Sequence, residues 1–475
     1  MLLSEKKRQI IDHFDKLAST REKWIKKSGY YYRDVQNFMT FNIPPGATIL
    51  EIGCGTGELL HSLRPQRGLG LDISPGMIRL AKDKFPDIEF MVMDGEQLAL
   101  DETFDYVIMS DVLCYLEDVQ KVFRQIKKVT TPCTRVILTY HSFLWQPFLE
   151  LAEHMGLKMP QLRLNWLNQD DLMNLLAVEG YDIVKAGRRL LFPFNFPVIS
   201  LLINRYVAFL PLLNRLCLTG FIISRILPES IPSFPEPSVS VVIPARNERG
   251  NIEEAIKRIP AMGSSMEIIF VEGHSQDGTL EEIRRVAEHY KNRYLIQYDV
   301  QEGIGKGDAV RKGFSMARGD ILMILDADLT VPPEDLPKFY EAIAAGRGEF
   351  INGSRLVYPL EEQSMRTLNI LGNKFFSLMF TWLLGQRLKD TLCGTKVISK
   401  RNYRNIVATR LYFGNFDPFG DFDLIFGAAK LNLKIVEIPI RYKSRRYGST
   451  NISRFKHGWL LLKMVIFAMN KIKFI

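Results

Sequence analysis

The stretch LMILDADLT, residues 322–330, is an apolar, strand-forming run that ends in two carboxylates, Asp326 and Asp328. Side chains two residues apart lie on the same side of an extended chain, so both carboxylates can contact one cation at the end of a buried strand. Hard divalent cations such as Mg²⁺ or Mn²⁺ prefer oxygen ligands and keep positions for substrate phosphates. The stretch therefore predicts a metal site, with Asp326 and Asp328 as ligands, that binds a nucleoside diphosphate. The alternative is a solvated turn after a strand.

Length and composition indicate a globular protein of two or three domains. The chain has 475 residues, of which 47% are hydrophobic and 24% charged, so each domain can build a sizeable core. The net charge of +9 indicates an anionic partner, such as a nucleotide, a lipid phosphate, an acidic membrane surface or nucleic acid.

The spacing of the cysteines and histidines and the charged N-terminal residues indicate the cellular compartment. The five cysteines and seven histidines are scattered without metal-ligand spacing, so we expect reduced thiols and no zinc site. Residues 1–27 are charged and lack the apolar core of a signal peptide. These features predict a cytoplasmic location.

A glycine-rich turn follows an apolar run near residue 50, and acids end the strand-like runs that come after it. One acid, Asp72, is placed to accept hydrogen bonds from both hydroxyls of a ribose. The turn lacks the spacing of a dinucleotide site, and no lysine follows it as in a phosphate loop. The pattern predicts a nucleoside site around Gly53, Gly55, Gly57 and Asp72, and two later strand-like runs also end in acids, Asp94 and Asp111.

Residues 40–190 resemble the class I S-adenosylmethionine-dependent methyltransferases. The resemblance implies S-adenosylmethionine as cofactor, with Glu51 and the glycine turn at its methionine end, Asp72 at the ribose and Asp94 at the adenine. Methyl transfer depends mainly on proximity and alignment, so no catalytic base is required. His141 is either a base or a polar lining residue. The alternative for the whole region is a fold retained without catalysis.

Residues 190–227 are apolar, with Arg205, Arg215 and Arg225 at intervals of ten. No uninterrupted run is long enough to span a bilayer. We expect helices that pack on the first domain as a lid. The alternative is helices in the membrane interface, with the arginines at the headgroups. Proline-rich residues 228–237 are predicted to be a linker between a first domain, 1–227, and a second, 238–475.

Strand-like runs at 238–248 and 267–272 alternate with helical patterns, and a basic glycine turn at 303–313 precedes the strand that ends in Asp326. This alternation predicts a mainly parallel sheet with ligands at the carboxyl ends of the strands. Residues 238–455 resemble the family-2 inverting glycosyltransferases with the GT-A fold, in the branch of dolichol- and polyprenyl-phosphate sugar synthases. The predicted fold class is therefore α/β, with two Rossmann-like domains.

The glycosyltransferase resemblance implies roles for residues in several motifs. The nucleotide-sugar donor is expected to contact Pro244, Ala245, Glu248, Glu272, Lys306 and Asp326. The acceptor side is expected to include Arg355 in NGSR (352–355) and Lys396 in DTLCGTK (390–396). The catalytic residues carried over are Asp328, Asp423 and Arg445, the last as a phosphate clamp.

Two acceptor classes remain open. A sugar hydroxyl needs a carboxylate base, for which Asp423 or Asp421 is placed, whereas a lipid phosphate needs cations to hold it. The basic loop 441–456 favours a polyprenyl phosphate. The apolar segments 374–384 and 459–469 are too short to span a bilayer. They either lie on an anionic membrane surface or bury against the domain or a partner in a homo-oligomer.

The sequence as a whole predicts a bifunctional enzyme, peripheral at the inner face of the membrane. It transfers a sugar to a polyprenyl phosphate or membrane-proximal glycan and methylates a hydroxyl or similar group, plausibly on the same glycan. One alternative keeps the glycosyltransferase and makes the first half a non-catalytic docking module. Another is an RNA-modifying protein, but we find no aromatic-and-basic recognition module and expect no nucleic acid.

Overall fold

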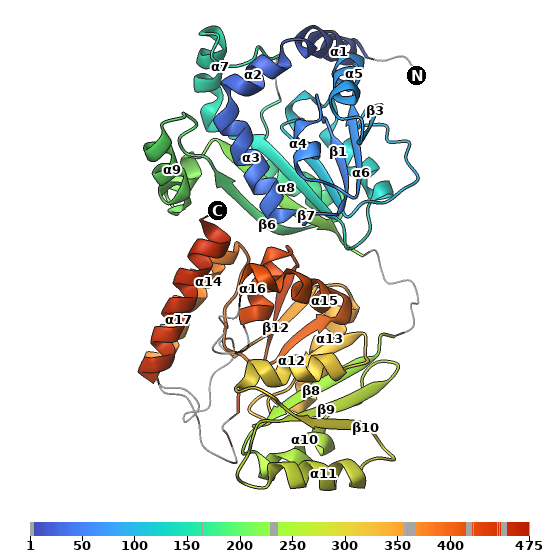
Figure 1. Cartoon of the computed structure of the whole chain (residues 1–475), viewed down its shortest axis with the longest axis vertical. Helices are drawn as coiled ribbons and strands as arrows, with labels where there is room; N and C mark the ends of the chain where they lie inside the picture. Colours follow the sequence, from blue (N-terminus) through green and yellow to red (C-terminus); the bar gives the residue numbers. More distant parts are fainter. Residues whose placement is uncertain are drawn as a thin grey trace. The chain divides into compact units, whose positions relative to one another are not determined.

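The computed structural model describes residues 4–162, 165–228, 236–355, 357, 367–414, 420, 422–443, 445, 447 and 454–474, without the side chains of 367–371 and 454–457. The chain divides into two compact units (Figure 1). Unit 1 comprises residues 1–227 with 474–475, and unit 2 comprises residues 228–473. Each unit is described by itself.

Unit 1 contains a seven-stranded sheet with the order β3-β2-β1-β4-β5-β7-β6. Its strands are β1 (Thr48–Ile52), β2 (Arg67–Asp72), β3 (Glu89–Val92), β4 (Tyr106–Ser110), β5 (Arg135–His141), β6 (Tyr181–Arg189) and β7 (Thr219–Ile226). The first five strands are parallel, and β7 is antiparallel to both β5 and β6. The strand order reverses between β1 and β4, and ligands of open α/β sheets bind at the carboxyl ends of strands at such a point.

Helices cover both faces of this sheet. They are α1 (Glu5–Ala18), α2 (Arg21–Lys27), α3 (Gly29–Asn42), α4 (Glu58–Ser62), α5 (Pro75–Lys84), α6 (Val119–Ile126), α7 (Gln146–His154), α8 (Gln169–Val178) and α9 (Pro197–Arg205). Short 3₁₀ turns lie at η1 (Leu113–Tyr115), η2 (Lys127–Val129), η3 (Phe143–Trp145), η4 (Val207–Phe209) and η5 (Leu213–Leu216). The alternation of side chains along a strand separates the two cores. Ile49 of β1 packs with α3, and the adjacent Leu50 packs with α8 on the other face.

The expectation of helices throughout residues 190–227 is wrong for its last part. Residues 219–226 form β7, in the sheet between β5 and β6, and Arg225 pairs with Asp182 of β6 at 3.1 Å. Seven of its eight residues are buried, so the strand has no polar side for an alternating pattern to reveal. A short apolar run of this kind cannot be assigned to helix or strand by periodicity alone.

Unit 2 contains a second seven-stranded sheet with the order β10-β9-β8-β11-β13-β12-β14. Its strands are β8 (Val239–Ala245), β9 (Met266–Glu272), β10 (Leu295–Val300), β11 (Ile321–Ile324), β12 (Phe350–Ser354), β13 (Lys396–Ser399) and β14 (Ile435–Pro439). All neighbours pair in parallel except β13, which is antiparallel to β11 and β12. The order reverses between β8 and β11, so the DAD stretch lies directly after a strand at this reversal. The predicted α/β class with two Rossmann-like domains is confirmed.

The helices of unit 2 are α10 (Ile252–Arg258), α11 (Thr279–His289), α12 (Lys306–Met316), α13 (Leu336–Ala344), α14 (Thr367–Leu384), α15 (Lys400–Thr409), α16 (Phe422–Lys430) and α17 (Arg454–Ala468). Shorter turns lie at η6 (Arg249–Asn251), η7 (Pro333–Asp335), η8 (Arg410–Tyr412) and the π-helical η9 (Met469–Lys473). Phe380 and Leu383 of α14 and Met464 of α17 are buried in one core cluster. Leu378 and Trp459, on the same two helices, are exposed. Across the described residues, none of the helices is both long and apolar enough to cross a membrane.

Phe270 of β9 offers a test of the unit 2 core, where its side chain is completely buried. Phe270→Ala leaves a cavity between β9 and its neighbours, and we expect the free energy of unfolding of this unit to fall by roughly 3–5 kcal/mol. Urea unfolding followed by circular dichroism measures the change. The control Leu411→Ala, at a side chain that is 94% exposed, should stay within about 0.5 kcal/mol of wild type. An equally small loss for Phe270→Ala would contradict this packing.

Candidate active sites

The two carboxylates of the DAD stretch are each held by a cation from a distant part of unit 2. Lys306, the first residue of α12, lies 2.7 Å from Asp326. Arg445 binds Asp328 at 2.7 Å through one nitrogen and Glu248 at 2.8 Å through another. The structure thus brings together five residues that the sequence predicted from separate motifs.

The electrostatic surroundings of these carboxylates differ. Burial would raise the pKa of Asp326, but the Lys306 ammonium, with more distant cations, holds it below its usual range. Burial raises the pKa of Glu248, although the Arg445 guanidinium opposes that shift. Asp328 also accepts hydrogen bonds from the backbone and hydroxyl of Thr330, which fix its orientation. Asp326 is therefore kept ionised at the carboxyl end of β11.

The pair Asp326 and Asp328 fits a divalent cation that takes most of its ligands from a substrate. Among the residues that the structure describes, no group of three His, Cys, Asp or Glu side chains could hold a metal by itself. Mg²⁺ commonly binds through one or two carboxylates together with substrate phosphates, and two aspartates after one strand meet that requirement.

The loop before β13 approaches Asp326 very closely. A Cβ added to Gly394 would overlap the Asp326 carboxylate and lie 2.6 Å from the Lys306 ammonium. Glycine is the residue that permits such an approach of backbone to a functional group. This contact places the predicted acceptor motif, residues 390–396, against the predicted metal ligand.

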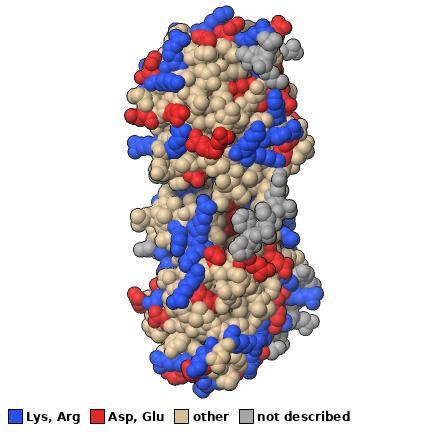
Figure 2. Space-filling view, turned by 90° about the vertical axis from the view of Figure 1, so that its right-hand side faces the viewer, with Lys and Arg blue, Asp and Glu red and all other residues tan. Residues whose placement is uncertain are grey.

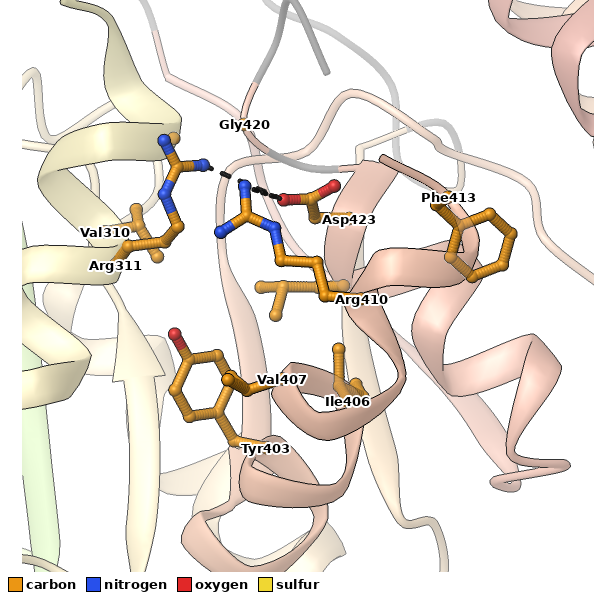
Figure 3. A pocket seen from close by; sticks show the side chains of 11 residues that line it. Val310, Arg311, Tyr403, Ile406, Val407, Arg410, Phe413, Gly420 and Asp423 are labelled. Atoms are coloured by element: carbon orange, nitrogen blue, oxygen red, sulfur yellow. Dashed lines mark ion pairs between the residues drawn. The ribbon is translucent and has the colours of Figure 1, made fainter. Parts of the chain in front are cut away.

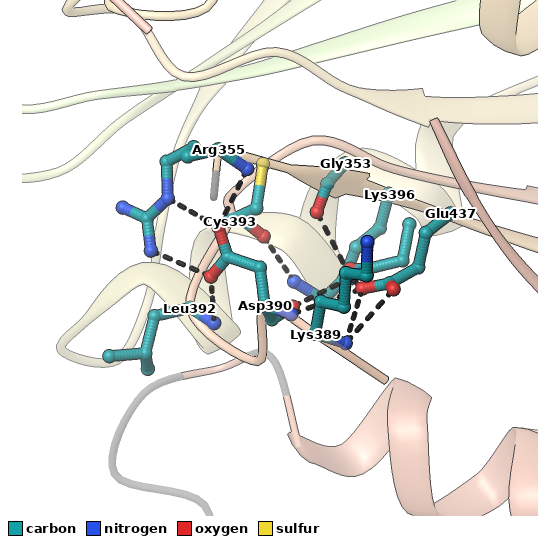
Figure 4. A network of polar contacts seen from close by, with 9 residues as sticks. Gly353, Arg355, Lys389, Asp390, Leu392, Cys393, Lys396 and Glu437 are labelled. Atoms are coloured by element: carbon teal, nitrogen blue, oxygen red, sulfur yellow. Dashed lines mark hydrogen bonds and ion pairs between the residues drawn. The ribbon is translucent and has the colours of Figure 1, made fainter. Parts of the chain in front are cut away.

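A buried polar network holds that loop (Figure 4). Arg355 makes a bidentate ion pair with Asp390, at 2.7 and 2.8 Å. The Glu437 carboxylate accepts from the backbone of Lys389 and Asp390. Lys396 is buried and donates to the Cys393 carbonyl. The contacts described for Arg355 and Lys396 are therefore with the protein itself, and their roles toward substrate stay predictions.

The remaining predicted donor residues line the ends of two neighbouring strands. Pro244 and Ala245 end β8, and Glu272 ends β9 beside them. The Glu272 carboxylate accepts from the backbone of His274 and Ser275, so it shapes the turn after β9.

Asp423 lies in a separate pocket formed by α12, α15 and α16 (Figure 3). Arg410 and Arg311 both point toward it, at 3.0 and 3.7 Å. Action as a base would require this pairing to break. The pocket also includes Gly307, the residue after Lys306, so it borders the site at Asp326. Asp421, the alternative base, lies outside the described residues.

In unit 1 the predicted glycine turn and the first acids meet at the end of β1. Asp72 accepts from the backbone of Gly55 at 2.9 Å and from that of Ser74. Gly53 has a φ of 79°, and a Cβ there would collide with Val112. Glu51 is buried with one carboxylate oxygen unpartnered, and burial raises its pKa to about 8. The turn is therefore folded around an acid that is protonated at neutral pH.

The N-terminal helices add cations that sequence patterns did not reveal. Arg21 of α2 lies against Gly55, and its buried Nε has no hydrogen-bond partner among the described residues. Burial would lower its pKa, but Tyr32 and Asp72 together raise it above the usual value. Lys7 of α1 forms ion pairs with Asp94 and with Glu96. Both cations come from charged helices whose patterns resemble those of ordinary surface helices.

A second cluster of polar side chains lies at the carboxyl ends of β4 and β5. Asp111, at a φ of 56°, accepts a hydrogen bond from Tyr31 of α3. The Tyr31 ring stacks on His141 with centroids 5.4 Å apart. Burial lowers the pKa of His141, so its imidazole is neutral at physiological pH. Asp111, predicted as a cofactor residue, is thereby linked to the candidate base.

The family models match both halves of the chain. Residues 50–138 match the model "Methyltransferase domain", and residues 240–405 match "Glycosyl transferase family 2". The chain carries a methyltransferase domain followed by a family 2 glycosyltransferase domain. Unit 1 contains the first of these domains and unit 2 the second.

Curated relatives match the glycosyltransferase half in part. The low-salt glycan biosynthesis hexosyltransferase Agl6 of Haloferax volcanii is 29% identical over 236 residues, which are 48% of this chain and 53% of the relative. The dolichol-phosphate mannosyltransferase of Pyrococcus furiosus is 40% identical over 25% of this chain and 33% of its own length. The undecaprenyl-phosphate 4-deoxy-4-formamido-L-arabinose transferase of Edwardsiella ictaluri is 37% identical over 46% of this chain and 64% of its own. The chain thus covers less than two thirds of each of these relatives.

Solved structures are similar to each half at low identity. A SAM-dependent methyltransferase of Thermotoga maritima, a possible histamine N-methyltransferase, is 16% identical with a TM-score of 0.35, covering 45% of this chain and 98% of its own. Glucosyl-3-phosphoglycerate synthase of Mycobacterium tuberculosis, in complex with uridine diphosphate, is 19% identical with a TM-score of 0.37, covering 50% and 80%.

Glu51 gives the methyltransferase domain a predicted pH dependence. The folded carboxyl keeps its proton up to about pH 8, whereas an unfolded glutamate loses it near 4.5. Between these values the folded state binds more protons, so Glu51 makes stability fall as pH rises. Glu51→Gln should remove that slope, with stability relative to wild type rising by up to about 1.4 kcal/mol per pH unit. Urea titrations from pH 5 to 8 measure this. The control Glu254→Gln, at an exposed residue of α10, should follow wild type, and a Glu51→Gln profile parallel to wild type would contradict the prediction.

Proposed function

We propose that the protein is a bifunctional enzyme. Its glycosyltransferase domain transfers a sugar from a nucleotide-sugar to a polyprenyl phosphate or a membrane-proximal glycan. Its methyltransferase domain transfers a methyl group from S-adenosylmethionine to a hydroxyl or similar group, on the same glycan. The observation that carries the proposal is the convergence of Lys306, Asp326, Asp328 and Arg445 at the carboxyl end of β11.

Sugar transfer requires the acceptor oxygen to attack the anomeric carbon opposite the departing diphosphate. A divalent cation bound by Asp326 and Asp328 would neutralise charge on that diphosphate. Lys306, at the N-terminus of α12, pairs with Asp326. Once a divalent cation takes the place of the Lys306 ammonium at Asp326, that ammonium can bind a phosphate oxygen instead. Gly394 brings the predicted acceptor loop against Asp326, which supports an acceptor that binds close to the proposed metal site.

The pairing of the cationic and acidic side chains favours a phosphate acceptor. A lipid phosphate is already an anion and needs a guanidinium to hold it, a role for which Arg445 is suited because it can form two parallel hydrogen bonds. Asp423, the candidate base for a hydroxyl acceptor, is paired with two arginines instead. Of the predicted basic loop at residues 441–456, the structure describes the side chains of residues 441–443, Arg445 and Tyr447.

In the methyltransferase domain, the glycine turn and Asp72 are proposed to hold the cofactor, with Glu51 at its methionine end. Arg21, whose guanidinium lies against Gly55, is available for the cofactor carboxylate. Neutral His141 can accept a proton from a hydroxyl acceptor, and Asp111 with Tyr31 fixes its position.

A peripheral position on the cytoplasmic face of a membrane is part of the proposal. Phe375 and Leu378 of α14, with Trp459 and Ile466 of α17, are exposed large apolar side chains on helices that otherwise pack into the core. Lys463 lies over the Trp459 ring at 5.8 Å, so a cation accompanies this apolar surface. Apolar side chains with interleaved lysines are typical of helices at an anionic lipid interface.

Nucleic acid is the less favoured partner. On the face drawn in Figure 2, Lys and Arg are spread over both units with Asp and Glu between them, rather than gathered in one basic groove. The cations described at the proposed sugar-transfer site, Lys306 and Arg445, are paired with carboxylates.

The DAD carboxylates provide the decisive test of sugar transfer. Asp326→Asn and Asp328→Asn should each lower the rate of nucleotide release roughly 100-fold or more, because charge on the leaving diphosphate is no longer neutralised. Turnover is measured with a panel of nucleotide-sugars, Mn²⁺ and lipid extracts. The matched control, Asp299→Asn, removes an exposed carboxylate that pairs with Lys312 outside the site. Unchanged rates in both DAD variants would remove the basis of the proposal.

Cofactor binding separates an active methyltransferase domain from a docking module. Calorimetry should show S-adenosylmethionine binding to the full chain, and Asp72→Asn should weaken it roughly 10- to 100-fold, since a charged hydrogen-bond acceptor is lost. Asp101→Asn, on an exposed loop of the same domain, should bind as wild type does. Absence of binding in the wild-type protein would support the docking alternative.

A further inference from the structure

Polar side chains hold the segment from Phe192 to Leu216 together and join it to the rest of the methyltransferase domain. In α9 the buried residue is Ser200, whose hydroxyl lies between the backbone of Phe194 and Phe196. Asn204 exchanges hydrogen bonds with the backbone of Phe192 and also donates to Tyr30 of α3. Farther along, Asn214 donates to the carbonyls of Arg188 and Ala208.

The large apolar side chains of the same segment face away from the domain. Val198 is 69% exposed and Leu212 80% exposed. Others on the segment that are exposed are Phe194, Phe196, Ile199, Leu201, Leu202, Leu210 and Leu216. A surface helix of a globular protein normally buries its apolar stripe and exposes its polar residues, so α9 is inverted.

A second segment extends this surface. Phe148, Leu151 and Met155, three and four residues apart along α7, form an exposed apolar row, preceded by Phe143 and Leu144. The two segments meet, because the Trp145 indole donates to the Leu216 carbonyl at 2.8 Å. We name the exposed side chains of 143–157 and 194–216 the apolar face. In Figure 1, α7 and α9 lie along the same side of this domain.

Within the segment 192–216 the charges are of one sign, whereas the α7 part of the apolar face also carries Glu150 and Glu153. From residue 183 to residue 228 the sequence has no Asp or Glu, and its cations are Lys185, Arg188, Arg189, Arg205, Arg215 and Arg225. Arg189 and Arg225 form ion pairs within the domain, whereas Arg205 and Arg215 are exposed among the apolar residues. The segment 192–216, with apolar side chains, arginines and no acids, matches the acyl region and anionic headgroups of a bilayer.

We propose that the apolar face docks the methyltransferase domain on an anionic lipid bilayer, with Arg205 and Arg215 at the headgroups. The face adjoins the candidate methyl-transfer site, because Phe143 follows His141 and Ser142 at the end of β5. A lipid-linked acceptor would then reach His141 directly from the membrane. This identification of the acceptor class rests on the proposed function, whereas the docking itself does not.

The test is vesicle binding by the full chain, without sugar or methyl donor. Flotation with phosphatidylcholine vesicles containing 30% phosphatidylglycerol should recover the wild-type protein, with at least tenfold weaker binding to phosphatidylcholine alone. The triple variant Val198→Gln, Leu201→Gln, Leu212→Gln should lose at least tenfold in affinity for the anionic vesicles. Arg205→Glu with Arg215→Glu should lose a similar factor on anionic vesicles and little on neutral ones.

The matched control removes apolar side chains that are equally exposed in the other domain. Ile304→Gln with Leu411→Gln, at residues 87% and 94% exposed, should bind vesicles within twofold of wild type. S-adenosylmethionine affinity of the triple variant should equal that of wild type, which shows that the domain is folded.

Wild-type vesicle affinity in the triple variant would overturn the proposal, as would a loss no greater than in the control. A wild-type dimer that the triple variant dissociates, with vesicle binding unchanged, would instead assign the face to a second copy of the chain. Vesicle binding without turnover of either donor would refute the proposed function and leave the docking intact.

Discussion

The glycosyltransferase site depends on the neutralisation of two adjacent carboxylates. Asp326 and Asp328 follow a buried strand, where like charges would repel each other and desolvation would disfavour ionisation. Lys306 and Arg445 offset both effects, and they come from the start of a helix and from a late loop. The same pairs hold two cations beside the carboxylates that are proposed to bind the metal and the diphosphate. A divalent ion entering between the aspartates would release those cations toward substrate, so the ion pairs link binding to folding.

The predicted acceptor loop, residues 390–396, is positioned by a buried network of ion pairs and hydrogen bonds. Its backbone reaches Asp326 at Gly394, and its position is set by the Arg355–Asp390 pair and by Glu437 on β14. An uncompensated charge at any member of this network would be costly in a buried setting. These contacts hold the loop in place, and under the proposed function it would need little further ordering when an acceptor binds. Arg355 serves this purpose through its ion pair, whatever it contributes to the acceptor.

Sequence reasoning succeeded where residues near in sequence carry the signal. The apolar run before Asp326 and the acids after successive strands of the first domain predicted both sheets, because parallel strands place their carboxyl ends at one edge. It failed where a contact joins distant segments. Lys7, Arg21 and Tyr31 lie on charged or aromatic N-terminal helices with no local motif, and only the fold brings them to Asp94, Gly55 and Asp111. Strand β7 was missed because both of its sides are buried.

The segment 192–216 shows a different limit. Its sequence predicts apolar helical structure, but composition does not say which side of a helix packs. That depends on whether Ser200, Asn204 and Asn214 find hydrogen-bond partners, and here they do. Ser200 bonds within the segment, and Asn204 and Asn214 join it to Tyr30 and Arg188, without using the exposed hydrophobic surface. A helix that gains its attachment from polar contacts can leave its leucines exposed only at a cost in water, and lipid is the environment that removes this cost while accepting its arginines.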